Sequence, residues 1–339
     1  MAWYNASWDY RVKVTVDKTK LGGADQTNYP VYVDLSNLPA GFFTNVKSDG
    51  TDIVVTNSDG TTKLKRELVS ITVASSIGEL YFKGTCSSSA NTDFYIYYGN
   101  AAGAETNDTD TWDSNYVLVC HMNDNPDSST VQDSTGNNND GTKVDPAQPT
   151  EATGKIGKGQ QGYDASHPIT FVDSASLDIA GDITLEIWHN GTHPTNDYLV
   201  FKSSSYDFIE YDNLYFRANG GTWEPSDSVV PAGWYYGAVV GENTTGTFYL
   251  QGAADGTFVY VPVIANSSDL TCLLRGNTYY ADEIRVSNIA RPASWITTTY
   301  NNESSPSTFY AVGDQEEQPA VGGGTATGFL TPRSKFRGA

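Results

Sequence analysis

The sequence predicts an all-β protein built from two successive β-sandwiches, a small antiparallel one and a larger one. Three observations support this fold class. Residues that favour strands and turns dominate, with 22 Tyr and 32 Gly among 339 residues. Apolar and polar residues alternate in short runs, and a single segment has a helical pattern. Aromatic and β-branched side chains suit a pleated, half-buried surface, whereas Gly, Asn and Asp suit the turns between strands. The length suggests about two domains.

The first domain is predicted to span residues 1–113. Its first strand covers residues 10–16, where Tyr10, Val12 and Val14 face one side and the intervening residues face the other. Clusters rich in Gly and Asp separate the apolar runs, which indicates tight turns and a small antiparallel β-sandwich. The further strands are predicted at residues 29–36, 52–57, 78–84 and 92–100.

Residues 101–114 are small, polar and acidic, and they predict a linker or a long surface connection. A second β-rich domain then spans residues 114–313, with Gly, Asn and Asp turns between its strands. Residues 290–302 form the one helical segment, with Pro292 near its start. The strands of this domain are predicted at residues 117–122, 183–188, 198–202, 213–217, 234–240, 246–252, 258–263 and 282–288.

The last segment, residues 314–339, has a different character. A polar, glycine-rich spacer leads to a basic and apolar tip, and so short a segment cannot form a core of its own. Two readings stay open, a disordered tail or cloning remnant, and a peptide that docks into a groove on a partner protein. The docking residues would be Phe329, Leu330, Arg333, Lys335, Phe336 and Arg337.

Charge and cysteine content exclude several function classes. The 40 acidic and 20 basic residues give a net charge of −20, and such a body repels phosphate backbones, so nucleic acid is not an expected partner. Cys86, Cys120 and Cys272 are far apart and lack Cys-x-x-Cys spacing, which predicts neither a disulfide framework nor a cysteine zinc site. Cys120 and Cys272 lie in apolar runs and are predicted to be buried thiols.

Neither a signal peptide nor insertion into a membrane is predicted. The first residues lack a basic start followed by an apolar stretch, and no apolar run approaches the roughly 20 residues that cross a bilayer. If the protein acts outside a cell, we expect it to leave by another route. Assembly into a virus particle that is released by lysis is one such route.

Several motifs of the second domain resemble, in order, those of laminin-G-like, concanavalin A-type domains of bacterial and phage proteins. Residues 121–142 resemble the opening strand of the family, which begins with His and is followed by an acidic turn. Residues 231–240 resemble its Gly-Trp strand with a run of valines. Residues 281–302 resemble its closing Asp-Glu strand and the short helix that follows. Residues 3–113 resemble an uncharacterised β-domain that often precedes such a module. The resemblance implies a concanavalin A-like (laminin-G-like) jelly-roll sandwich in a bacterial surface or phage structural protein.

The sequence predicts no catalytic constellation. Glycoside hydrolases of this fold carry a compact run of acids on one strand face, because retaining enzymes need two carboxylates about 5–5.5 Å apart. Glu186 has no acidic partner two residues on, and Glu210 and Asp212 share a strand face without a third acid. His189 and His193 lie on a turn, which disfavours a metal pair. We expect no enzyme, and a glycoside hydrolase of concanavalin-like fold is the alternative.

Calcium is the one cofactor that the sequence predicts, in a structural role. Calcium prefers carboxylate, amide and carbonyl oxygens, and the acidic turn at residues 133–140 offers several. In the resembled family this turn and the closing acidic strand lie near a structural calcium, which implies Asp133, Asn139 and Asp282 as ligands, with Asp124 as a weaker fourth. The alternative is that these side chains cap turns by accepting backbone hydrogen bonds.

Glycan binding is the usual role of such a sandwich. Trp223, Tyr206 and Tyr211 are predicted to lie on loops as stacking platforms for sugars, with packing over the sandwich edge as the alternative for each. We therefore predict a non-catalytic virion surface protein, such as a capsid decoration, fibre or tail-associated adhesin. It would bind host or environmental glycans and dock onto another virion structural protein through its tail, and a homo-oligomer is compatible with this role. The alternative from another class is a purely structural decoration protein that binds no sugar.

Overall fold

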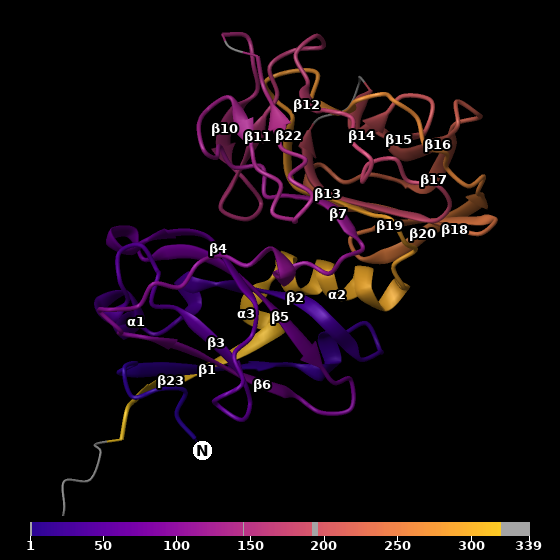
Figure 1. Ribbon diagram of the computed structural model, residues 1–339. Helices are drawn as coiled ribbons and strands as arrows, with labels where there is room; N and C mark the ends of the chain where they lie inside the picture. Colours follow the sequence, from indigo (N-terminus) through magenta and orange to yellow (C-terminus); the bar gives the residue numbers. More distant parts are fainter. Residues whose placement is uncertain (1, 145, 192–195, 320–339) are drawn as a thin grey trace, which may run out of the picture.

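The computed structural model describes residues 2–144, 146–191 and 196–319, and this part of the chain is almost entirely β-structure, as the sequence predicts (Figure 1). The strands form two bodies, one built mainly from the start of the chain and the other from its middle. Among the described residues, the helices are too short or too polar to span a bilayer.

The first domain is a β-sandwich of two antiparallel sheets with the strand orders β23-β1-β6-β3 and β2-β5-β4. Val12, Val14 and Val16 are fully buried between them, on the side that the alternation predicts. Its strands are β1 (Tyr10–Val16), β2 (Gln26–Asp34), β3 (Val54–Asn57), β4 (Arg66–Thr72), β5 (Ile77–Cys86), β6 (Thr92–Tyr98) and β23 (Tyr310–Glu317). Its short helices are η1 (Lys18–Lys20), η2 (Leu35–Asn37), α1 (Ala40–Asn45), η3 (Val73–Ser75) and η4 (Thr109–Thr111).

The second domain is a larger sandwich, whose inner sheet faces the first domain and whose outer sheet faces away from it. The inner sheet has the order β10-β11-β22-β13-β18-β19-β20, with β7 also paired to β22, and the outer sheet has the order β17-β16-β15-β14-β21-β12-β9-β8. The inner strands are β7 (Tyr116–Cys120), β10 (Thr150–Thr153), β11 (Lys158–Gln161), β13 (Ile183–Gly191), β18 (Gly233–Glu242), β19 (Thr245–Leu250), β20 (Ala253–Val259) and β22 (Tyr280–Ser287). The outer strands are β8 (Thr130–Val131), β9 (Gly141–Thr142), β12 (Ile169–Phe171), β14 (Asp197–Lys202), β15 (Tyr206–Tyr211), β16 (Asn213–Ala218), β17 (Glu224–Val229) and β21 (Leu270–Leu273).

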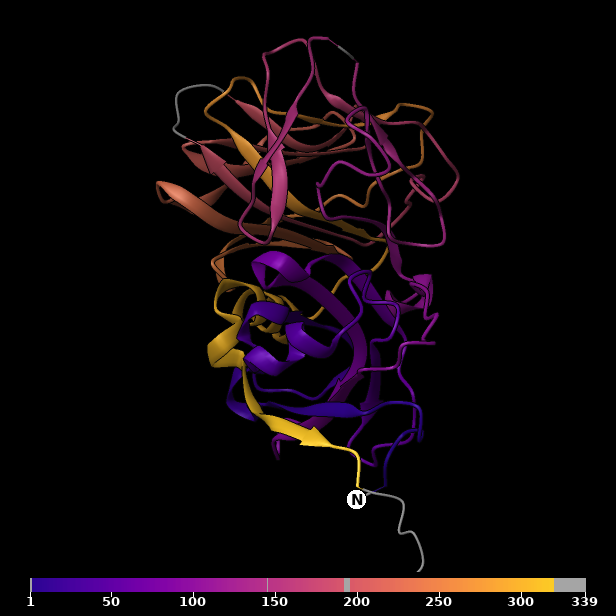
Figure 2. The same cartoon turned by 90° about the vertical axis from the view of Figure 1, so that its left-hand side faces the viewer.

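The end of the chain returns to the first domain. After β22, α2 (Ala293–Ser304) and α3 (Pro306–Phe309) pack against β2, and β23 pairs antiparallel with β1, with Tyr10 opposite Glu317 and Val16 opposite Tyr310. Figure 2 shows this gold strand beside the indigo start of the chain. The boundary expected between residues 313 and 314 therefore falls inside a strand. The acidic, partly exposed β23 shows little alternation of apolar and polar residues, which is why the sequence did not reveal it.

The inner sheet is buried on both of its faces. Leu185 and Val239 pack into the core of the sandwich, whereas Trp188, Tyr236 and Val240 pack into the core of the first domain. A sheet buried on both faces needs apolar side chains on both, which explains the unbroken apolar run of residues 234–240. The outward face of the inner sheet is thus part of the apolar core of the first domain.

The connection between the domains is packed, although residues 101–114 were expected to form a linker or a surface connection. Several of its residues are exposed, but Trp112 is only 3% exposed, and its indole Nε1 donates to Glu67 Oε2 over 2.7 Å. Asp113 at its end pairs with Arg291. The segment therefore ties the first domain to the second.

Candidate functional site

A row of side chains crosses the exposed side of the outer sheet. Leu273, Tyr198, Ile209, Tyr215 and Pro225 are successive cross-strand partners on β21, β14, β15, β16 and β17. Directly paired residues share one sheet face, so these five side chains form one line. The alternate residues of the same strands point into the sandwich core. The line therefore lies on the side of the sheet that neither domain core covers.

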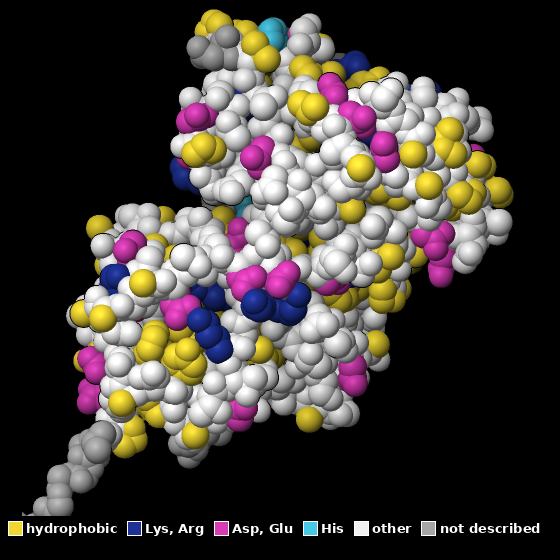
Figure 3. Space-filling view, viewed as in Figure 1, with side chains coloured by type: hydrophobic (Ala, Val, Ile, Leu, Met, Phe, Trp, Pro, Cys, Tyr) yellow, Lys and Arg dark blue, Asp and Glu magenta, His cyan; other side chains and the backbone are white. Residues whose placement is uncertain are grey.

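A hollow of about 200 Å³ lies along this line. The five residues that line it, here called the aromatic face, are Asn196, Ile209, Tyr211, Tyr215 and Trp223. Tyr211 is 42% exposed, and Tyr215 and Trp223 are half-buried, so their rings are held in place and yet reach the solvent. Hydrophobic side chains gather at the right-hand edge of the upper body, over β16 and β17 (Figure 3).

An ion pair on the sheet positions Trp223. Arg217 Nε and Nη2 donate to Asp207 Oδ2 over 2.8 and 2.6 Å, and the guanidinium lies 4.2 Å from the centroid of the Trp223 ring. Burial raises the pKa of the Asp207 carboxyl, and the charge of Arg217 opposes that rise. At the other end of the row, the Arg275 guanidinium lies 4.8 Å from the centroid of Tyr198. Aromatic rings and hydrogen-bond donors thus alternate along the face.

The structure separates the three aromatic residues that the sequence singled out. Trp223 and Tyr211 both line the aromatic face. Tyr206 instead begins β15 and is fully buried, with its hydroxyl donating to Leu177 O over 3.1 Å, so the expectation of an exposed loop position was wrong for this residue. Tyr215 was not expected at the site, although the alternation in residues 213–217 places its side chain opposite the buried Leu214 and Phe216.

The residues expected to bind calcium hold a turn together. Asp133 Oδ1 accepts the backbone N–H groups of Val119 and Thr135, each over 3.0 Å, and Asp133 Oδ2 accepts that of Asn139 over 2.9 Å. The Thr135 hydroxyl adds a fourth hydrogen bond to Asp133 Oδ2. Burial raises the pKa of Asp133, and these donors oppose the rise. These contacts match the alternative in which Asp133 caps a turn.

The other three expected ligands have separate partners. Asn139 donates to Val117 O and Ser176 Oγ, Asp282 Oδ2 accepts Ile156 N over 2.8 Å, and Asp124 pairs with Lys143. Within the described ranges, the three aspartates do not meet as a group of possible metal ligands. Calcium binding by these residues stays a prediction from the resemblance.

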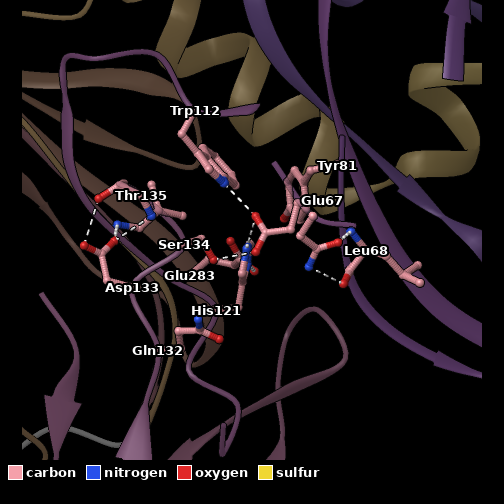
Figure 4. Close-up of polar contacts among 12 residues, drawn as sticks. Glu67, Leu68, Tyr81, Trp112, His121, Gln132, Asp133, Ser134, Thr135 and Glu283 are labelled. Carbon is pink, nitrogen blue, oxygen red and sulfur yellow. Dashed lines mark hydrogen bonds and ion pairs between the residues drawn. The ribbon is translucent and has the colours of Figure 1, made fainter. Parts of the chain in front are cut away.

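Ionisable side chains also cluster at the junction of the two domains (Figure 4). His121 Nδ1 lies 2.7 Å from Glu283 Oε1, and His121 Nε2 lies 3.4 Å from Glu67 Oε2. Burial works against a charged imidazole, but the two carboxylates outweigh it and raise the pKa of His121 well above its usual value. Glu67 also accepts the Trp112 indole N–H and the Ser134 hydroxyl. Because these partners come from both domains, the cluster joins them.

A second buried group extends this junction. Arg285 pairs with Glu283 and with Glu303, and Glu303 accepts the indole N–H of Trp188 over 2.7 Å. Glu283 has a left-handed backbone conformation, with φ at 51°, beside an irregularity in the pairing of β13 with β22. A bulge of this kind redirects side chains, and here it accompanies the contacts of Glu283 with His121 and Arg285.

A larger hollow, of about 520 Å³, lies beside the junction. Its aromatic lining residues, Trp112 and Tyr116, are 3% and 1% exposed. Neither ring offers a free face to a ligand, because Trp112 packs against Tyr81 and Tyr116 against Trp295. The aromatic face therefore remains the better candidate for ligand binding.

The acids considered for catalysis do not form a working pair. Glu186 is buried and accepts the Tyr236 hydroxyl over 2.5 Å. Glu210 is fully buried, whereas Asp212 is exposed in a tight turn with φ at 59°, so the strand face that the two were expected to share is lost. Glu210 instead lies near Asp197 and His189, with ligand atoms within 4.8 Å of one another.

Some residues weighed in the sequence lie outside the described residues. These are the expected docking residues Phe329, Leu330, Arg333, Lys335, Phe336 and Arg337, and His193, for which a metal pair with His189 was not expected.

No protein-family model and no curated protein matches the sequence. Among solved structures, this chain is similar to the binding domain of Paraclostridial Mosquitocidal Protein 1. The match covers 56% of this chain and 52% of that domain's chain, with 15% sequence identity and a TM-score of 0.45. Domain 4 of AbnA, a GH43 extracellular arabinanase from Geobacillus stearothermophilus in complex with arabinotriose, matches 54% of this chain and 96% of its own, with 19% identity and a TM-score of 0.44.

The ligand-binding domain of botulinum neurotoxin serotype D, in complex with N-acetylneuraminic acid, matches 56% of this chain and 51% of its own, with 10% identity and a TM-score of 0.44. This chain thus spans about half the length of the mosquitocidal protein and neurotoxin domains. The resemblance to laminin-G-like domains stays a prediction, whereas the all-β, two-sandwich architecture is confirmed.

Proposed function

We propose that this protein is a non-catalytic, glycan-binding protein, and that the aromatic face holds the sugar. The observation that carries the proposal is the row of half-buried aromatic rings around a hollow on an otherwise uncovered sheet face. Sugar rings have apolar faces of C–H groups and polar edges of hydroxyls. A ring stacked on Tyr215 or Trp223 would bury its apolar face and keep its hydroxyls available for hydrogen bonds.

The polar groups around the hollow suit the edge of such a ring. Asn196 and the Tyr211 hydroxyl can donate to or accept from sugar hydroxyls, and Arg275 offers further donors at the end of the row. The hollow, about 200 Å³, is smaller than the roughly 300–1,000 Å³ of sites for drug-sized ligands. It would therefore hold a single ring of a longer glycan, which predicts weak binding per site and a gain from multivalent display.

A glycan array followed by calorimetric titration tests the proposal. We expect the full chain to retain at least one class of glycan, and we expect Tyr215→Ala and Trp223→Ala each to weaken binding at least about tenfold, since each removes a stacking surface. Tyr163→Ala is the matched control, because Tyr163 is 47% exposed and does not line the hollow. Unchanged affinity in both face variants would exclude this site.

The wider biological role is proposed from the sequence. We place the protein on the surface of a virus particle, as a decoration, fibre or tail-associated adhesin whose C-terminal tail docks onto another structural protein. The test is deletion of residues 320–339, which should abolish incorporation into particles and leave glycan binding intact. A protein that is incorporated normally without this segment would refute the docking role. A full chain that binds no sugar on the array would favour the purely structural alternative.

A further inference from the structure

Three strands bring a histidine and two carboxylates together inside the second domain. Asp197 on β14 and Glu210 on β15 are direct cross-strand partners in the outer sheet, and His189 reaches them from β13 in the inner sheet. All three side chains are fully buried. The ligand atoms of the three residues lie within 4.8 Å of one another. The group thus spans the two sheets, close to one end of the sandwich core.

The spacing of these atoms suits a bound metal ion. His189 Nε2 lies 3.2 Å from Asp197 Oδ2. Zinc binds histidine nitrogen at about 2.0–2.1 Å and carboxylate oxygen at about 2.0–2.2 Å, so two ligands on a tetrahedral ion lie about 3.3 Å apart. The observed pair already has this separation. The carboxylate of Glu210 provides a third ligand from the neighbouring strand.

Neighbouring groups hold two of the ligands in orientation. The Tyr235 hydroxyl lies 3.1 Å from His189 Nδ1, and the backbone N–H of Arg275 donates to Asp197 Oδ1 over 2.8 Å. His189 Nε2 donates its hydrogen to Asp197 Oδ2 when no ion is bound, because a carboxylate oxygen can only accept. A bound ion would displace this proton to solvent, and Nδ1–H would then donate to the Tyr235 oxygen. Contacts of this kind to the outer atoms of metal ligands fix their rotamers and tautomers in metalloproteins.

The charges of the group also favour a cation. Two carboxylates lie side by side, and both are fully buried. The nearby guanidinium of Arg275 lies over the ring of Tyr198, on the other side of the sheet. A divalent ion between the two carboxylates would offset their repulsion and the cost of burying them.

We propose that His189, Asp197 and Glu210 bind one divalent transition-metal ion, with zinc the best fit. One imidazole and two carboxylates form a mixed nitrogen and oxygen set that suits zinc, whereas calcium prefers six to eight oxygen ligands. The described residues supply three ligands, and a tetrahedral ion would take one more. The ion would clamp β13 of the inner sheet to β14 and β15 of the outer sheet.

The site lies directly beneath the aromatic face. Tyr198 and Ile209 are neighbours of Asp197 and Glu210 along their strands, and their side chains point to the opposite side of the sheet. Metal binding would therefore order the two strands that carry this face. The metal proposal does not depend on glycan binding, since metal content and metal affinity are measured without any sugar.

The experiment uses the full chain, stripped with a chelator and dialysed. Titration with zinc chloride, followed by calorimetry and elemental analysis, should give one ion per chain, and zinc should raise the Tm, because a ligand that binds the folded state alone stabilises it. Calcium chloride at the same concentration should not displace zinc from this site, because calcium prefers six to eight oxygen ligands. Cobalt(II) in place of zinc should produce the visible absorption bands of a low-symmetry site.

Variants locate the ion. Glu210→Gln keeps the shape of the side chain and removes its charge, and we expect it to lower zinc affinity at least about tenfold, as Asp197→Asn should. Glu186→Gln is the matched control, since Glu186 is equally buried on β13 and contacts Tyr236 instead. Folding of each variant is checked by circular dichroism before titration. The proposal is overturned if the stripped chain binds no zinc, or if a folded Glu210→Gln variant binds zinc with unchanged affinity.

Discussion

The side-chain amide of Asn302 on α2 pairs with both backbone polar groups of Tyr32 on β2. Tyr32 N donates to Asn302 Oδ1 over 2.8 Å, and Asn302 Nδ2 donates to Tyr32 O over 2.9 Å. β2 is an edge strand of its sheet, and the amide occupies this edge as another strand would. An uncovered edge is a template for aggregation. One residue near the end of the chain thus completes a sheet formed near its start.

The first prediction concerns this pair. Asn302 is fully buried, so Asn302→Ala would leave two buried backbone groups of Tyr32 without partners. Each such loss costs about 1–3 kcal/mol, and we expect the free energy of unfolding to fall by about 2–6 kcal/mol. Urea denaturation measures this change. The control is Asn301→Ala, which removes one half-buried hydrogen bond to Lys20 O and should cost less than about 1.5 kcal/mol.

A second prediction concerns the returning strand. A chain that ends at Ser305 loses the fully buried Phe309, the buried Tyr310 and all pairing of β23 with β1. Burial of one such side chain stabilises a protein by roughly 1.5–3 kcal/mol, and whole domains are stable by only about 5–15 kcal/mol. We expect this truncated chain to aggregate or to lose cooperative thermal unfolding. A chain that ends at residue 319 keeps every described contact of β23 and should match the parent.

The contrast between local and distant pairing explains which features the sequence revealed. The alternation in residues 10–16 and the apolar run in residues 234–240 predicted β1 and β18, because side-chain periodicity is local. The pairing of β23 with β1 joins residues about 300 positions apart, and no local pattern in residues 310–317 records it.

The same distinction applies to the sites. Trp223 and Tyr211 could be chosen as exposed aromatic residues, but their common position with Tyr215 depends on the register of β15 and β16. The approach of His189 to Glu210 depends on the packing of two sheets against each other, which periodicity does not record.

A third prediction concerns the thiols. Cys86, Cys120 and Cys272 are free and buried, as the apolar surroundings of the last two predicted. Burial raises the pKa of Cys86 to about 12, and it also raises the pKa of the other two thiols. Because the thiolate is the reactive species, iodoacetamide at pH 8 should leave the folded protein unmodified and should label all three thiols in guanidinium chloride.

Mass spectrometry counts the labels. The exposed variant Ser203→Cys provides the positive control and should gain one label in the folded state. Fast labelling of Cys86 in the native protein would contradict the buried position of this thiol at the end of β5.

The last prediction concerns pH and rests on Glu303 at the domain junction. Burial, together with the charge of Glu283, raises the pKa of Glu303 from 4.5 to about 7, while Arg285 opposes the rise. A carboxyl whose pKa is raised in the folded state binds its proton more tightly there than in the unfolded chain. Its contribution to stability is therefore complete below about pH 4.5 and is lost as the pH rises through about 7. We expect the Tm of the chelator-treated protein to fall between about pH 4.5 and pH 7 and to level off at higher pH.

The variant Glu303→Gln tests this assignment. Glutamine keeps an acceptor for the Trp188 indole N–H, and Glu283 remains as a partner of Arg285, so the junction should still form. Because glutamine does not titrate, calorimetry should show a flatter dependence of Tm on pH in this variant, most clearly between about pH 4.5 and pH 7. The exposed variant Glu242→Gln should keep the parental slope. If Glu303→Gln keeps that slope as well, another junction group, such as His121, governs the loss of stability.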